Sequence, residues 1–105
     1  MENEFDPDAI YEAELEAGND WVDKDHAARL LEEQRKSVLA EIMLDSPSAT
    51  NAAREMEALG SKTYRQYILE MCTAKREANK ARVKYDAVKT LSDNRRTEAV
   101  NRRLS

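Results

Sequence analysis

Glycine and proline are scarce in this sequence, which has only two of each among its 105 residues. β-Sandwiches and barrels need many tight turns, and glycine and proline are the residues that supply them. The residue types that dominate instead, such as alanine, glutamate, lysine, arginine and leucine, are strong helix formers. A chain of this length is long enough for one small domain and too short for a large α/β enzyme. The sequence therefore predicts an all-α fold.

Cysteine and long apolar runs are also lacking. The single cysteine, Cys72, cannot form a disulfide within the chain, so the fold does not depend on an oxidising compartment. Apolar runs such as Ile42-Met43-Leu44 are far shorter than the roughly 20 residues that span a bilayer. Residues 1–8 are acidic and have no apolar core, unlike a secretory signal. We expect a cytoplasmic protein that has no membrane segment.

Positive charge is nearly missing from the N-terminal end of the chain, and negative charge is the minority in the C-terminal half. The net charge of −4 conceals 16 acids and 5 bases in residues 1–60, against 5 acids and 12 bases in residues 61–105. Within residues 1–25, ten acids accompany the single base Lys24. A basic C-terminal half indicates a nucleic acid or an acidic protein as partner. The acidic N-terminal segment is either a partner for that basic half or a solubilising tail.

Capping residues divide the helical sequence. Gly18 and Asn19 favour the end of a helix, and Asp20 can cap the next one. Ser46 is a good N-cap before Pro47, and Ser61 is a second N-cap after Gly60. We therefore predict helices at about 7–17, 20–44, 47–59 and 61–103. In this interpretation residues 1–19 are an acidic arm or short helix, residues 20–105 are a helical hairpin, and residues 45–60 are its connection.

Both long predicted helices carry an apolar repeat of seven residues, which is typical of a coiled-coil seam. Antiparallel partners have residue numbers with a constant sum, and the pairs Ile42/Tyr64 and Trp21/Tyr85 both give 106. The sequence thus predicts an antiparallel hairpin, formed within one chain or swapped between two. The seam comprises Trp21, Ala28, Leu31, Val38, Ile42, Tyr64, Tyr67, Met71, Ala74, Ala78, Tyr85 and Val88.

A hairpin of this size buries little apolar surface and is marginal alone. A second apolar edge, made of Leu30, Leu39 and Met43 with Ile68, Leu69 and Cys72, is left uncovered by the seam. We expect this edge to form a homodimer with the architecture of a four-helix bundle.

No set of residues with enzymatic or metal-binding spacing is present. His26 is the only histidine and has no second ligand at zinc-site spacing. The segment Gly60-Ser61-Lys62-Thr63 lacks the rest of a phosphate-binding loop. Cys72 could be a reactive thiol beside Lys75 and Arg76, but a small packing residue is the better interpretation. We predict no catalytic residue, cofactor, metal or small-molecule substrate.

The functional hypothesis rests on the basic C-terminal helix. Its candidates for binding nucleic acid or an acidic partner are Lys80, Arg82, Lys84, Lys89, Arg95, Arg96, Arg102 and Arg103. A basic helix can follow phosphates. The alternative is a solvated helix face, partly neutralised by the N-terminal arm. Tyr85 is the one aromatic residue among these basic residues, so the helix offers few rings on which bases could stack.

The order of elements also resembles small helical proteins of phages and prophages encoded near recombination genes. The resemblance rests on the charged segment Leu30 to Lys36, on Ala53-Arg54-Glu55, on Tyr64, Tyr67 and Tyr85, and on Arg95-Arg96. It implies a non-enzymatic accessory protein of a bacterial host cell, which binds DNA or a nucleic-acid-processing protein. A second hypothesis is a protein-directed adaptor or inhibitor, whose acidic N-terminal arm mimics nucleic acid.

Overall fold

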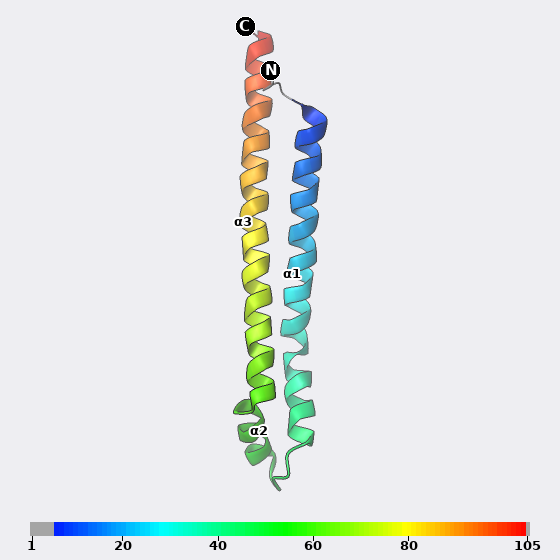
Figure 1. Ribbon diagram of the computed structural model, residues 1–105, viewed down its shortest axis with the longest axis vertical. Helices are drawn as coiled ribbons and strands as arrows, with labels where there is room; N and C mark the ends of the chain where they lie inside the picture. The colour runs from blue at the N-terminus through cyan, green and yellow to red at the C-terminus, as the bar shows by residue number, and fades with distance from the viewer. Residues whose placement is uncertain (1–5, 105) are drawn as a thin grey trace.

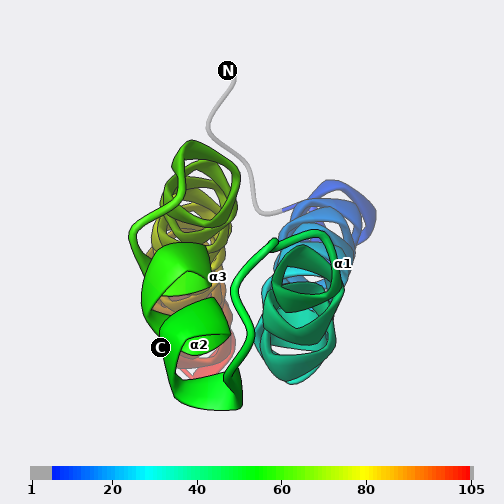
Figure 2. The ribbon, with the colours of Figure 1, turned by 90° about the horizontal axis from the view of Figure 1, so that it is seen from below.

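The computed structural model describes residues 6–104 and confirms the all-α prediction. Three helices, α1 (Pro7–Leu44), α2 (Asn51–Leu59) and α3 (Lys62–Leu104), account for almost all of this range, which contains no strand. Figure 1 shows α1 and α3 side by side and running in opposite directions. The short helix α2 lies at the end of the rod opposite the start of α1 and the end of α3 (Figure 1), and it is nearest the viewer in the end-on view of Figure 2. The result is a rod of 79 × 20 × 16 Å.

The first helix is continuous, so the predicted break at residues 18–20 is wrong. Asp6 caps its start by accepting hydrogen bonds from the backbone N–H groups of Asp8 and Ala9, at 3.1 and 3.2 Å. Gly18 has no positive φ and lies inside the helix. A Cβ atom at Gly18 would stand 3.2 Å from Cε1 of Tyr85 in α3. Gly18 therefore allows a close approach of α3 and does not end a helix.

The second helix starts later than its sequence suggests. The predicted start at Pro47 with Ser46 as N-cap is wrong, because Thr50 is the cap: its Oγ1 accepts the Ala53 N–H at 3.2 Å. The Ser46 and Ser48 hydroxyls donate instead to the carboxylate of Glu57.

These two hydrogen bonds fasten the connection to α2. They hold the pKa of Glu57 below its usual value, because they stabilise the ionised carboxylate. Arg54 adds a bond from Nε to the carbonyl oxygen of Ser48, at 2.7 Å. The connection is therefore tied to α2 by Ser46, Ser48 and Arg54, and of these only Ser46 had been expected to cap a helix.

The third helix begins where capping chemistry predicts. Ser61 Oγ accepts the backbone N–H of Tyr64 at 3.1 Å and donates to the carbonyl of Ala58 at 2.7 Å. The predicted N-cap at Ser61 is confirmed.

The facing sides of α1 and α3 form a thin core. Every predicted seam residue is buried or half-buried; Ala28, Met71 and Ala78 are the buried ones. The other buried positions of the pair, Ala17, Ala81 and Ser92, are small, so Met71 is the one large buried side chain among residues 6–104. Small residues let two helices approach closely, but they remove little apolar surface from water.

Specific contacts join the two long helices along their length. The rings of Trp21 and Tyr85 lie with centroids 5.5 Å apart and planes tilted by 32°. The Tyr67 hydroxyl donates to the carbonyl oxygen of Leu31. Because these contacts join opposite helices at well-separated heights, they hold one relative alignment along the rod.

Towards the chain termini the interface becomes polar. Ser92 is only 1% exposed, and its Oγ has no hydrogen-bond partner. Oε1 of Glu14 is also buried without a hydrogen bond, and Arg96 Nη2 lies 3.8 Å from it. The buried polar groups at this end of the interface therefore lack hydrogen-bond partners, unlike the Tyr67 hydroxyl in its middle.

Candidate nucleic-acid interface

Five cations of α3 recur at intervals of seven residues: Lys75, Arg82, Lys89, Arg96 and Arg103. Seven residues are close to two helical turns, so these side chains lie along one line, which we call the basic edge. At 1.5 Å per residue the basic edge extends over about 42 Å. It borders α1, because Lys75 Nζ lies 3.0 Å from Glu32 Oε1 and Arg96 lies 3.8 Å from Glu14.

The other predicted binding residues lie elsewhere on α3. At 100° per residue, Lys84, Arg95 and Arg102 share the opposite flank of the helix, and Lys80 lies on its outer face. Lys80 is 3.8 Å from Glu77, and Arg102 is 3.9 Å from Glu98. The eight predicted residues therefore do not form one patch, and the structure brings only four of them together on the basic edge.

Much of the positive charge is available to a ligand. Among residues 6–104, no ion-pair partner is found for Arg82, Lys84, Lys89, Arg95 or Arg103, and all five are exposed. Arg96 is paired with Asp93 at 3.2 Å as well as with Glu14. Phosphate groups could neutralise the free side chains without first displacing a carboxylate.

Most acidic residues of α1 form no ion pair with α3 among residues 6–104. Asp8, Glu12, Glu16 and Asp23 are exposed, and only Glu14 of the first 20 described residues pairs with α3. Residues 1–5 of the predicted acidic arm lie outside the described range. The acidic residues of α1 and the basic residues of α3 therefore lie on neighbouring helices, but most cations of the basic edge are not neutralised by an ion pair with α1.

An apolar groove lies between α1 and α3 next to the basic edge. It has a volume of about 260 Å³. Its lining consists of Tyr11, Glu14, Leu15, Gly18, Asn19, Trp21, Val22 and Tyr85, and we call it the aromatic groove. Tyr11 is 59% exposed and Val22 is 62% exposed. Three of the six aromatic residues of the chain thus share one surface.

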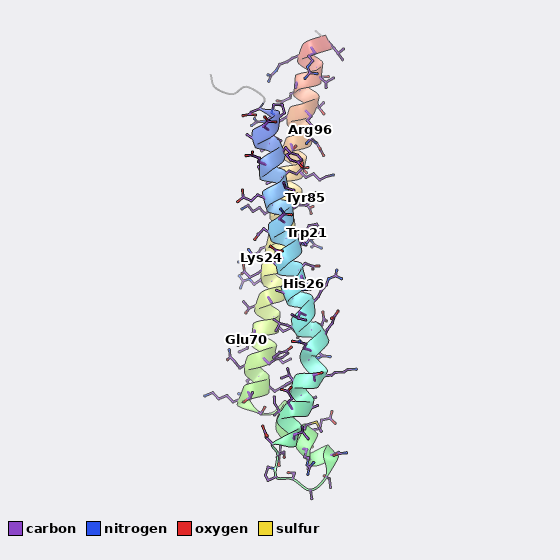
Figure 3. All side chains as sticks on the ribbon, turned by 90° about the vertical axis from the view of Figure 1, so that its right-hand side faces the viewer. Trp21, Lys24, His26, Glu70, Tyr85 and Arg96 are labelled. Carbon is purple, nitrogen blue, oxygen red and sulfur yellow. The ribbon has the colours of Figure 1, made fainter. Side chains whose placement is uncertain are left out.

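The groove adjoins the basic edge at Tyr85. Tyr85 follows Arg82 by three residues and precedes Lys89 by four, so all three lie on the same side of α3. Figure 3 shows Trp21, Tyr85 and Arg96 in succession along the half of the rod that carries the start of α1 and the end of α3.

Sequence reasoning missed this groove because it assigned Tyr11 to a separate arm. One signal could have revealed it: Tyr11, Leu15, Gly18 and Val22 are spaced four, three and four residues apart, which is the spacing of one helix face. That face becomes visible only when α1 is taken as continuous.

The residues of the predicted dimer edge differ in exposure within a single chain. Leu39, Met43 and Ile68 are half-buried. Leu30 is 44% exposed and lies about 200° around α1 from the buried Ala28, so it points away from α3. By the same geometry Leu69, which is 57% exposed, points away from α1.

Cys72 and His26 are both exposed. Cys72 does not pack within a single chain, and its packing role at the dimer edge stays a prediction. It borders a shallow surface groove with Arg76 and Val83.

In the part of the chain that the structure describes, no cluster of three His, Cys, Asp or Glu side chains could hold a metal ion. No helix found there has the length and apolar character needed to cross a bilayer.

Comparisons of the chain with protein-family models, with curated proteins and with solved structures give no match. The basic edge and the aromatic groove, both defined by the chain's own residues, are therefore the features from which a function can be inferred.

Proposed function

We propose that this protein is a non-enzymatic, phage-type accessory protein that binds nucleic acid, or a nucleic-acid-processing protein, through its basic helix α3. The observation that carries the proposal is the basic edge, with a cation at every seventh residue and Arg82, Lys89 and Arg103 free of carboxylate partners among residues 6–104. Its phage-type character is supported only by the order of sequence elements.

The shape of the rod limits how a nucleic acid could be contacted. The rod is 20 × 16 Å in cross-section, and α1 lies alongside α3, whereas the major groove of B-DNA is about 12 Å wide. The two helices together do not fit that groove, so base edges are out of reach of most of α3. Contacts are then made to phosphates, and binding tolerates many sequences.

The structural unit in this proposal is an antiparallel, coiled-coil-like hairpin that dimerises into a four-helix bundle. The thin core supports dimerisation, as do exposed apolar side chains on the outside of both helices, such as Leu30, Leu69 and Val83. Sedimentation equilibrium at micromolar concentration tests it. A purely monomeric mass would remove the dimer from the proposal and leave the basic edge intact.

The main test removes the charge of the basic edge. Arg82, Lys89, Arg96 and Arg103 are changed together to glutamine, and binding to labelled oligonucleotides is followed by fluorescence anisotropy. If each residue neutralises one phosphate, native affinity falls roughly 50- to 150-fold between about 50 and 200 mM salt. The variant is expected to bind more weakly, and its salt slope is smaller by about one for each phosphate that is no longer neutralised.

A matched control removes the same charge elsewhere. Arg35, Lys36, Lys62 and Arg65 are exposed and lie towards the α2 end of the rod, so changing these four to glutamine should leave most of the affinity. Equal losses in both variants would show that only net charge matters. Absence of salt-dependent binding by the native protein would refute nucleic-acid binding.

One observation favours a second candidate function, an adaptor or inhibitor that acts through the acidic surface of α1. Glu12, Glu16 and Asp23 are exposed and unpaired among the described residues, as expected of a nucleic-acid mimic. Deleting residues 1–19 is a poor test, because Ala17 and Gly18 pack against α3. Changing these three acids to Gln, Gln and Asn should abolish adaptor activity while strengthening nucleic-acid binding, if it exists, by lowering repulsion.

A further inference from the structure

We infer that the aromatic groove and the adjoining basic edge together bind a single-stranded nucleic acid, with bases stacked on Tyr11, Trp21 and Tyr85 and phosphates along Arg82, Lys89 and Arg96. This inference rests on the proposed function and adds the class of ligand.

The aromatic groove provides the stacking platform. Its rings come from both helices, and Tyr11, 59% exposed, presents most of its side chain to a ligand. Every base has a flat face that can stack on an aromatic ring, so such sites accept many sequences. In a duplex the base faces are covered by their neighbours, so only a single strand can use the groove.

The charges around the groove favour one orientation of the strand. Arg82 and Lys89 flank Tyr85 on α3 and have no carboxylate partner among residues 6–104. On the α1 side, Glu14 lines the groove, with its nearest cation at 3.8 Å. Phosphates are attracted to α3 and repelled by α1. The strand backbone therefore follows α3, and its bases point across the groove towards Tyr11 and Trp21.

A second copy of the chain fits this surface less well. Covering the groove with the apolar side of another helix would also cover Arg82 and Lys89, and burying unpaired cations is costly. A nucleic-acid strand provides both flat apolar faces and negative charge, which is the combination that this surface presents.

The test uses the full chain and its intrinsic fluorescence, because Trp21 is its only tryptophan. Unlabelled oligothymidylate of about 20 nucleotides, longer than the roughly 4–16 nucleotides that such sites occupy, is titrated at low salt. Saturable quenching of Trp21 is expected with the single strand, and none with a duplex of equal length.

Variants locate the contact. Tyr11→Ala is expected to weaken oligothymidylate binding about 5-fold or more, the loss typical of one stacked base, and to leave duplex binding unchanged. Because Tyr11 is largely exposed, its removal should not unfold the rod, which circular dichroism checks. Leu44→Ala, which removes another exposed apolar side chain (78% exposed) outside the groove, is the control and should bind as the native protein does.

The outcomes separate this inference from the proposed function. If the basic-edge variant loses anisotropy-detected binding while Trp21 is not quenched and Tyr11→Ala binds normally, the groove is not used and only this inference fails. If the native protein binds no oligonucleotide, this inference fails together with the nucleic-acid-binding part of the proposed function.

Two other results would also overturn the inference. One is quenching of Trp21 by an acidic amphipathic peptide but not by oligothymidylate. The other is Trp21 emission that changes only with protein concentration as a dimer forms, which would assign the groove to a second copy.

Discussion

Replacing Ser92 by alanine should stabilise this protein. Ser92 is 1% exposed between α1 and α3, and its hydroxyl has no hydrogen-bond partner. A buried polar group without a partner typically costs about 1–3 kcal/mol. Alanine also has the higher helix propensity, by about 0.5 kcal/mol. Against these gains stands only the small void left by one oxygen atom, so we expect a net gain of about 1–2 kcal/mol in the free energy of unfolding.

A matched substitution isolates the effect of burial. Ser37 lies inside α1 and is exposed, so Ser37→Ala gains helix propensity alone, about 0.5 kcal/mol. Both variants are compared with the native protein in thermal and urea unfolding followed by circular dichroism. At about 4–8 °C per kcal/mol, Ser92→Ala should raise the Tm clearly more than Ser37→Ala. Equal gains, or a lower Tm for Ser92→Ala, would refute an unsatisfied hydroxyl at this position.

Two further predictions concern hydrogen bonds outside the binding surface. Tyr67→Phe should lower the free energy of unfolding by about 1 kcal/mol in urea unfolding, because it removes the hydrogen bond to the Leu31 carbonyl; an unchanged midpoint would show that this bond is absent in solution. Glu57 should titrate in NMR below its ordinary pKa of 4.5, and changing Ser46 and Ser48 to alanine should return it towards that value. Because the folded pKa is lowered, the contribution of Glu57 to stability is present above pH 4.5 and is lost as the pH falls through its folded pKa; an unshifted titration would contradict this.

Composition and residues close in sequence account for two confirmed predictions. The all-α fold follows from the scarcity of glycine and proline, and the start of α3 follows from the single hydroxyl of Ser61. The failures have a common cause. Gly18 and Ser46 have the local chemistry of a helix end and a helix start, but their actual roles depend on Tyr85 and Glu57, which lie 67 and 11 residues away.

The sequence by itself determined the helical class, the division of charge between the two halves and the regular spacing of the cations from Lys75 to Arg103. Only the tertiary structure decided that α1 is continuous through Gly18. A glycine inside a helix costs roughly 1 kcal/mol, and packing against α3 can offset a cost of that size. It also decided that Tyr11 and Trp21, from the acidic half, share a groove with Tyr85 beside the cations. The contacts that were missed, of Gly18 with Tyr85 and of Ser46 with Glu57, depend on how these segments pack, which no local pattern of residues encodes.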